Sequence, residues 1–238
     1  MKRTLFFLLL ILTTSGCNEL QQVVNQLPQG TPGIGNAEIA QGLREALNQG
    51  IDKQVQKLSL KDGFFKNDLV KILLPDELKK VDKTLRDVGL GNLADEGLRI
   101  LNRAAEDAVG EATPIFVDAV KGITFGDAKQ ILLGADNAAT QYLEQSTSTE
   151  LYNKFRPKID SSFKKVGADK IWNSLITKYN NLPLTNNVDP NLTEYVTQEA
   201  LEGVYTMIAV EEKEIRTKLS SRTTDLLRKV FALQDRQQ

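Results

Sequence analysis

The chain has 238 residues, enough to bury a sizeable core in one domain or a closely packed pair, and we favour one. Its formal charge of −1 leaves no basic excess for nucleic acid. The lack of histidine excludes imidazole metal sites and Ser-His-Asp or Cys-His catalysis within this chain. Ala, Leu, Glu, Lys and Gln are plentiful and β-branched runs are short, so we expect an all-α fold.

The N-terminus has the pattern of an export leader. Lys2 and Arg3 precede an apolar run over residues 5–12, which is too short to span a bilayer and suits a signal peptide. The run leads to Thr-Ser-Gly-Cys at 14–17, which resembles the lipobox of bacterial lipoproteins, with Thr14 where leucine is preferred. The resemblance implies a signal peptide over residues 1–16 and a lipid on Cys17. An ordinary secretory signal with a stray cysteine is the alternative.

The residues after this only cysteine suggest a destination and a tether. Asn18 stands where lipoproteins of the inner membrane typically carry aspartate, so the resemblance implies sorting to the outer membrane, with the protein on its periplasmic face. Residues 17–36 are rich in Gln, Asn, Gly and Pro, which favours a flexible tether spanning on the order of 25 Å. Residues 21–26 could instead form a helical turn.

Periodic apolar residues predict one bundle of eight to ten helices over residues 37–233, followed by a short tail at 234–238. Residues 64–74 contain aromatic and branched side chains before a proline, so this stretch could be a short extended segment. In chain order, the expected helices cover about 36–59, 76–88, 93–109, 114–123, 124–133, 136 onward, 147–167, 168–179, 192–220 with a possible break near Thr197, and 223–233.

Local signals mark several of these boundaries. Asn36 and Asp136 are expected N-caps, because their side chains can accept hydrogen bonds from the first free amides of a helix. Capping boxes are expected at Thr124–Asp127 and at Thr147–Glu150. Pro157 is expected to kink or divide its helix, since it lacks an amide hydrogen and crowds the preceding turn.

One predicted helix interrupts its own apolar pattern. At about 100° per residue, Glu211 and Glu212 fall within the apolar stripe of the helix that follows Leu201. Buried carboxylates are costly unless paired. The helix end therefore either projects beyond the bundle, with Arg216 pairing to Glu212 on the surface, or turns both glutamates inward to meet a cation or a buried arginine. The candidates for such a network are Arg216, Arg103, Arg156 and Asn102.

Aromatic side chains offer a different kind of site. An apolar pocket for a lipid or small molecule could be lined by Phe116, Trp172, Tyr179 and Tyr205, although the aromatic stripe at 172–179 also suits a helical core. We find no metal-ligand or phosphate-binding motif and predict neither a metal nor another cofactor. We expect no catalysis, and an enzyme that uses Glu211 and Glu212 is a lesser alternative.

Six short motifs occur in order along the helical region: GLREAL at 42–47, KDGF at 61–64, LNRAAE at 101–106, PIFVDA at 114–119, DAKQIL at 127–132 and TTDLLRKVF at 223–231. Together they resemble a family of bacterial exported proteins catalogued only as a domain of unknown function. The resemblance covers about residues 37–232. It implies a single helical domain, but no activity, substrate or cofactor.

These observations favour a protein that acts by binding. We expect a lipid-anchored periplasmic protein that serves as a structural or assembly factor of the cell envelope. Its expected partners are the membrane, through the N-terminal lipid, and an envelope protein. The alternative is a carrier of a lipid or a small apolar molecule. The sequence predicts no oligomeric state.

Overall fold

The computed structural model describes residues 34–87, 89, 91–166 and 191–236, with a few positions between 170 and 180. By its contacts the chain divides into residues 1–34 and 35–238, and the described residues belong almost entirely to the second unit. The predicted signal peptide, Cys17 and most of the predicted tether lie outside the described residues.

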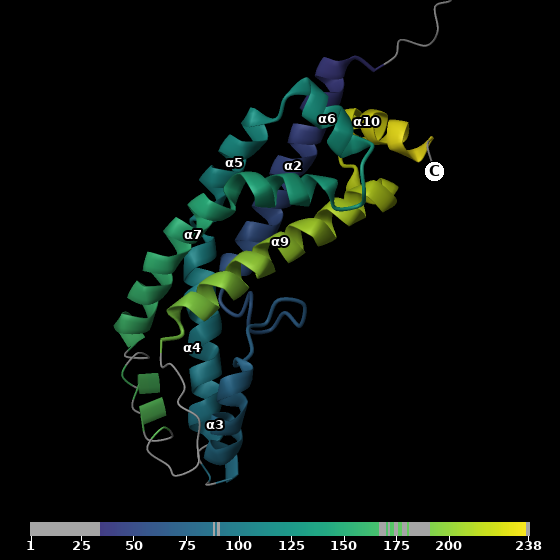
Figure 1. The fold of residues 1–238 in the computed structure, drawn as a ribbon. Coiled ribbons are helices and arrows are strands. Elements are labelled where there is room, and N and C mark those ends of the chain that lie inside the picture. Colours follow the sequence, from purple (N-terminus) through teal and green to yellow (C-terminus); the bar gives the residue numbers. More distant parts are fainter. Residues whose placement is uncertain are drawn as a thin grey trace, which may run out of the picture. The chain divides into compact units, whose positions relative to one another are not determined.

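The described residues form eight α-helices and one short 3-10 helix, with no strand among them, which confirms the predicted all-α fold. None of these helices is both long enough and apolar enough to cross a membrane. In chain order (Figure 1) they are α2 (Asn36–Ser59), α3 (Asp76–Asp87), α4 (Gly91–Val109), α5 (Ala112–Gly122), α6 (Phe125–Leu132), α7 (Ala138–Val166), α9 (Thr193–Thr217), η1 (Leu219–Ser221) and α10 (Asp225–Asp235).

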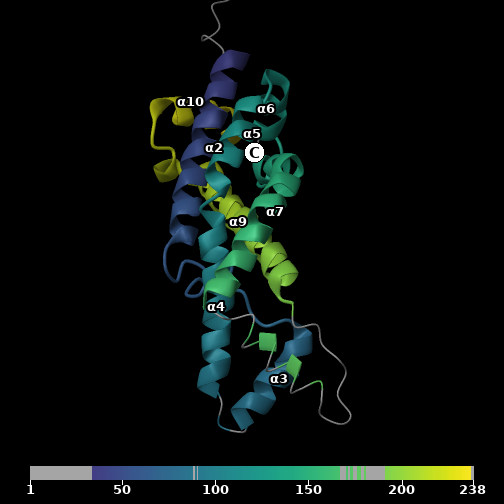
Figure 2. The ribbon, with the colours of Figure 1, turned by 90° about the vertical axis from the view of Figure 1, so that its left-hand side faces the viewer.

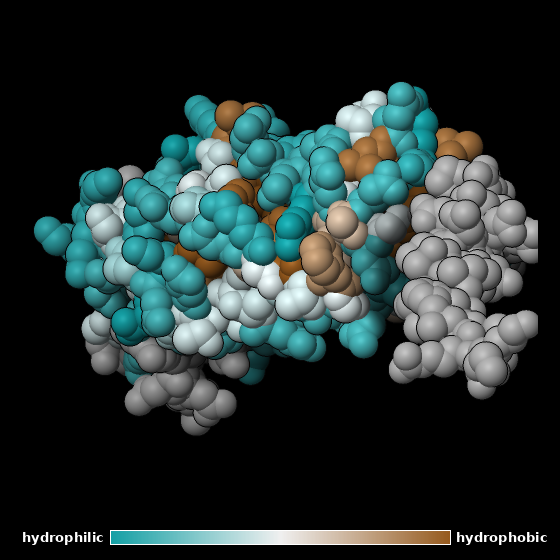
Figure 3. Space-filling view, turned by 90° about the horizontal axis from the view of Figure 1, so that it is seen from above, coloured by the Kyte–Doolittle hydropathy of each residue, from teal (hydrophilic) through white to brown (hydrophobic). Residues whose placement is uncertain are grey.

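Two groups of contacts organise this helical unit. Helix α7 lies against α9, α4 and α5, and helix α2 lies against α5, α6, α9 and α10. Helix α3 lies beside α4 (Figure 1 and Figure 2). Burying a large apolar side chain contributes about 1.5–3 kcal/mol, so the apolar stripes turned inward supply the main stabilisation. The face shown in Figure 3 is correspondingly hydrophilic over most of its area.

The predicted capping boxes have different outcomes. The box at Thr124 forms as predicted: the Asp127 amide donates to Thr124 Oγ1 at 3.2 Å, and the Thr124 amide donates to the Asp127 carboxylate at 3.0 Å. Hydrogen bonds from the Thr124 side chain and backbone hold the pKa of Asp127 below its ordinary value. The prediction of a capping box at Thr147 was wrong. Thr147 lies inside the continuous helix α7, and its hydroxyl donates to the Leu143 carbonyl one turn back.

Helix α7 is longer than predicted, because it joins two predicted helices, whereas α9 is slightly shorter than the predicted 192–220. Helix α7 contains Pro157 without being divided there, and it changes direction along its length in Figure 1. The hydroxyl groups of Ser146 and Thr147 donate to carbonyls of the preceding turn, which is a common cause of helix bending. Helix α9 passes unbroken through Thr197, where a break was considered.

Several helix ends differ from the prediction by one to three residues. Gly35 flanks the start of α2 in place of Asn36, and the Gly35 amide donates to Glu38. Helix α10 extends to Asp235, so the predicted tail begins inside a helix and Gln234 is buried. The predicted helix at 168–179 and the loop after it lie mostly outside the described residues.

An irregular segment, residues 60–75, connects α2 to α3, and we call it the Leu60 loop. It includes the predicted extended stretch, whose residues Val70 and Ile72 are buried. Asn102 of α4 accepts a hydrogen bond from the Ile72 amide at 2.9 Å and donates to the Ile72 carbonyl at 2.8 Å. One side-chain amide therefore satisfies both backbone groups, much as a neighbouring strand would.

Candidate functional site

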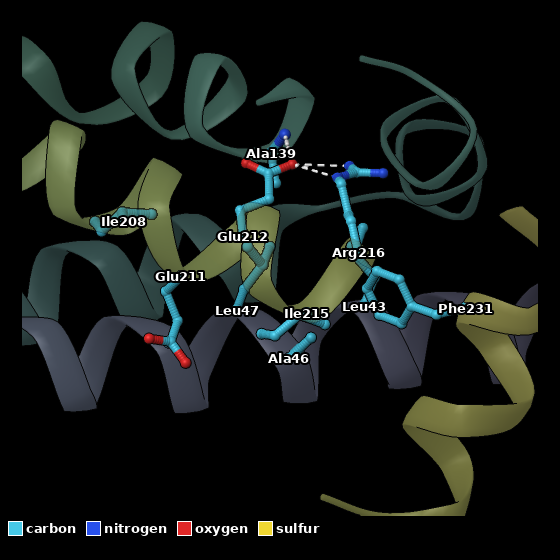
Figure 4. A pocket seen from close by; sticks show the side chains of 11 residues that line it. Leu43, Ala46, Leu47, Ala139, Ile208, Glu211, Glu212, Ile215, Arg216 and Phe231 are labelled. Carbon is cyan, nitrogen blue, oxygen red and sulfur yellow. Dashed lines mark hydrogen bonds and ion pairs between the residues drawn. The ribbon is translucent and has the colours of Figure 1, made fainter. Parts of the chain in front are cut away.

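The two glutamates that interrupt the apolar stripe of α9 are both buried, each with 7% of its surface exposed. Because they are adjacent on a helix, their side chains leave the backbone in different directions. Figure 4 shows Glu212 turned toward Ala139 and Arg216, whereas Glu211 points toward α2. They consequently belong to two separate sites.

Glu212 caps the start of helix α7. Its carboxylate accepts hydrogen bonds from the Ala139 amide at 2.9 Å, from the Thr140 amide at 2.8 Å and from Thr140 Oγ1 at 2.8 Å. The first amides of a helix have no partner inside it, and the helix dipole favours negative charge there. Sequence analysis predicted this role for Asp136, but the acceptor for these two amides comes from α9.

Arg216, one turn after Glu212, caps the end of helix α6. Its guanidinium donates to the Ile131 carbonyl at 2.8 Å and the Leu132 carbonyl at 2.9 Å, and also to Gln234 of α10 at 3.2 Å. It donates to Glu212 as well, from Nε at 3.0 Å and from Nη2 at 2.8 Å. We call this buried pair the Glu212–Arg216 clamp, because it fixes the corner between α6 and α7 at both helix ends.

The chemistry of the clamp is that of a structural element. The two oxygens of Glu212 accept five hydrogen bonds, about as many as a carboxylate has lone-pair positions. The cavity beside it has a volume of about 20 Å³, enough for one water molecule. Among the residues that the structure describes, no group of three or more acidic residues could hold a metal ion.

Glu211 forms a second, smaller cluster with α2. Lys53 Nζ lies 2.8 Å from its Oε1, and Gln54 Nε2 donates to its Oε2 at 2.7 Å. The Glu211 side chain passes over Gly50, where an added Cβ would lie 3.2 Å from Glu211 Cγ. The lysine approaches from the surface, with 58% of its side chain exposed. Glu211 is therefore paired at the edge of the core.

Asn102 and Arg103 do not join the network of Glu211 and Glu212 for which they were considered. Asn102 is fully buried but holds the Leu60 loop, and Arg103 is half exposed and pairs with Glu106 and Asp107 on its own helix.

Sequence analysis missed Glu106, which is 2% exposed and accepts a hydrogen bond from the Phe64 amide at 3.2 Å. The signal available for it was its place one turn after Asn102.

Three of the four aromatic residues predicted to line an apolar pocket, Phe116, Trp172 and Tyr205, lie among the described residues. Phe116 and Tyr205 pack edge to face, with ring centroids 5.8 Å apart. Trp172 lines a different hollow and packs so closely on Gly97 that an added Cβ would lie 2.5 Å from its ring. Tyr179 lies outside the described residues. The hollows beside Trp172 and Tyr205 are separate and neither is lined by Phe116, and the shared pocket stays a prediction.

Between α7 and α9 lies an open hollow of about 480 Å³, which we call the α7–α9 groove. Glu144 and Glu202 contribute carboxylates to it, and neither forms an ion pair with a described residue. Burial, followed by the charge of Glu202, raises the pKa of nearby Glu199. The complete lining is Thr140, Glu144, Ser148, Gln198, Leu201, Glu202, Tyr205, Thr206 and Ala209.

Thr140 connects the groove to the clamp. It lines the groove, and both its amide and its hydroxyl donate hydrogen bonds to Glu212. At the groove floor, the Tyr205 hydroxyl lies 2.8 Å from Thr147 Oγ1. Burial, opposed by this hydrogen bond, raises the pKa of Tyr205 to about 12. Buried polar contacts at these two points fix the separation of α7 and α9.

A second buried arginine caps the end of α9, and sequence analysis missed it. Arg222 is 2% exposed and donates to the carbonyls of Ile215 at 3.0 Å and Arg216 at 2.8 Å. It also donates to both carboxylate oxygens of Asp235, at 2.6 and 2.8 Å. These hydrogen bonds hold the pKa of Asp235 below its ordinary value.

These contacts define an all-α domain in which buried side chains of one helix cap the ends of others. The model of the family described as "Protein of unknown function (DUF4197)" matches residues 33–232, so the chain belongs to this family. Comparison with curated proteins and with solved structures gave no match in either case.

Proposed function

We propose that this protein is a lipoprotein of the outer membrane that binds an envelope protein at the periplasmic face and acts there as a structural or assembly factor. The location is supported by the leader and the lipobox pattern ending at Cys17. The mode of action is supported by the α7–α9 groove, the observation that carries the proposal. An assembly factor needs a preformed surface, and this groove lies between the two longest helices of the described chain.

The lining of the groove indicates the chemistry of its partner. Glu144 and Glu202 offer carboxylates without a paired cation, beside the apolar side chains of Leu201 and Ala209. A helix or extended segment that carries Lys or Arg next to apolar residues would complement this lining. No catalysis is expected, because the most buried carboxylate nearby, Glu212, is saturated by hydrogen bonds.

Site-specific photocrosslinking in intact cells tests this proposal. A photocrosslinking amino acid replaces Thr206 in the groove, and the matched control places it at Gln130, an exposed position on α6. We expect a defined protein adduct from the groove position and none from the control. Replacing Glu144 and Glu202 by lysine in the same chain should abolish the adduct. Equal labelling at the two positions, or no adduct at either, would contradict the proposed mode of action.

Mass spectrometry of the mature protein tests the anchor separately. The expected N-terminal peptide begins at Cys17 and carries acyl chains. An unmodified cysteine at this position would refute the proposed lipid anchor, whatever the crosslinking result.

A further inference from the structure

The Leu60 loop exposes an unusual amount of apolar surface. Five large apolar side chains are more than half exposed among the described residues, and three of them, Leu60, Leu69 and Leu73, lie in this loop. Leu60 and Leu69 are 65% and 63% exposed and line the same open hollow of about 460 Å³. Clustered exposed leucines of this kind mark contact surfaces, whereas single ones need no explanation.

Buried side chains of α4 fix the backbone of the loop by hydrogen bonds. Glu106 accepts hydrogen bonds from the amides of Phe64 and Phe65, and Asn102 pairs with both backbone groups of Ile72. The Phe64 ring is fully buried against Gly203, where an added Cβ would lie 2.6 Å from the ring. The exposed leucines are therefore carried on a fixed backbone.

A tight turn places Leu60 at the surface. The Gly63 amide donates to the Leu60 carbonyl at 2.9 Å, and Asp62 between them has a φ of 66°. A Cβ at position 63 would lie 2.5 Å from the carbonyl oxygens of Lys57 and Leu58, so glycine is required there. This turn leads the chain away from the end of α2 with Leu60 turned outward.

The loop is locally basic in a chain whose net charge is −1. Three lysines and two aspartates lie in the loop, and Lys57 lies just before it in the last turn of α2. One aspartate, Asp62, is already paired with Lys66 at 2.7 Å. Lys57 and Lys61 line the same hollow as the exposed leucines, and neither forms an ion pair with a described residue. Exposed leucines beside unpaired lysines complement an anionic bilayer surface, which offers phosphates above an apolar interior.

We propose that the Leu60 loop docks the helical unit onto an anionic phospholipid surface. Leu60 and Leu69 enter the boundary between headgroups and acyl chains, and Lys57 and Lys61 face the lipid phosphates. This inference rests on the proposed membrane location, which brings the loop within reach of a bilayer. It adds a second contact that orients the domain, and it does not depend on the protein partner of the α7–α9 groove.

Fluorescence quenching on vesicles tests the docking. The full chain carries Cys17→Ser and one new cysteine, either Leu60→Cys or the control Leu219→Cys, and Leu219 is 70% exposed after α9. Each cysteine bears an environment-sensitive dye. The vesicles contain phosphatidylethanolamine and phosphatidylglycerol with a nitroxide-labelled lipid as quencher. Both chains keep the same leader, so any difference between them reports the position of the label.

We expect the label at position 60 to be quenched several-fold more than the label at 219. The difference should shrink in vesicles of phosphatidylcholine alone and at high salt, because the lysine contribution is electrostatic. Replacing Lys57 and Lys61 by glutamine should weaken the contact about 5-fold per lysine. Equal quenching at positions 60 and 219 on anionic vesicles would overturn the proposal.

The two proposals fail in different ways. Vesicles contain no protein partner, so loss of the groove crosslink leaves the quenching result unchanged. If a photocrosslinking residue at Leu60 captures a protein in cells while vesicles leave the label unquenched, the loop is a protein contact and lipid docking is refuted.

Discussion

Replacing Glu212 by glutamine tests the Glu212–Arg216 clamp most directly. The substitution keeps the shape of the side chain, removes its charge, and turns an amide donor toward groups that are themselves donors. Arg216, with 1% of its side chain exposed, is left without a counter-charge. Breaking a buried ion pair from one side costs about 3–5 kcal/mol. That is a large part of the roughly 5–15 kcal/mol by which domains are stable.

A double variant separates capping from simple charge pairing. When an isolated buried ion pair is replaced by apolar residues on both sides, stability often stays the same or rises. Here Glu212→Met with Arg216→Met also strips two amides of α7 and the Leu132 carbonyl of their partners, while the Ile131 carbonyl keeps the Gly134 amide. Each unsatisfied buried group costs about 1–3 kcal/mol. The double variant should therefore remain at least about 3 kcal/mol less stable than the natural chain.

Urea unfolding followed by circular dichroism measures these free energies. The matched control is Glu214→Gln on the same helix, where an exposed pair with Lys218 should contribute at most about 1 kcal/mol. A double variant as stable as the natural chain would refute the capping role. A Glu212→Gln variant no less stable than the control would refute the importance of the pair itself.

Three further variants probe other contacts. Asn102→Ala removes the hydrogen-bond partners of the Ile72 amide and carbonyl in the Leu60 loop. It should lower the free energy of unfolding by about 2–4 kcal/mol and speed amide exchange at Ile72. Unchanged exchange would count against the proposed role of Asn102. Gly42→Ala places a Cβ 2.6 Å from Val230 Cγ2 and should lower the free energy of unfolding by about 1–3 kcal/mol, measured by thermal unfolding. Adding Val230→Ala should restore part of this stability. If it restores none, the clash with Val230 is not the cause of the loss. Arg222 lowers the folded-state pKa of Asp235, so the ionised carboxylate stabilises the fold at pH values above its unfolded-state pKa of about 4. This contribution to stability is lost as the pH falls through the folded-state pKa. Asp235→Asn should therefore be less stable at neutral pH and should lose less stability on acidification, as urea titrations at several pH values would show; parallel curves would exclude this role.

Signals confined to a few residues predicted much of the fold. The capping box at Thr124 was predicted correctly because both of its partners lie within one turn. The same spacing at Thr147 was misleading, since a threonine inside a helix can bond its hydroxyl to the preceding turn. The spacing alone does not distinguish the two situations. What decides at Thr147 is the packing of α7 against α9, where Thr147 meets Tyr205.

The candidate sites were predictable only in part. Glu211 and Glu212 stood out because two charges lie within an apolar stripe, and that mismatch was visible in the sequence. Arg216, one turn after Glu212, was also visible as a candidate partner, but the capping role was not, because the amides that Glu212 caps lie 72 and 73 residues away along the chain. Arg222 was missed for a related reason: it follows α9 in an irregular segment, where no helical period marks a side chain as buried.

The corner between α6 and α7 spans few residues, yet α9 completes it. A chain emerging from its N-terminus contains both helices before Glu212 and Arg216 are made, so the bare helix ends at this corner stay hydrated until α9 arrives. Final closure is thereby deferred until α9 has been synthesised. Nascent chains that stop short of Glu212 should keep this corner frayed, and the domain should become protease-resistant only once α9 has docked.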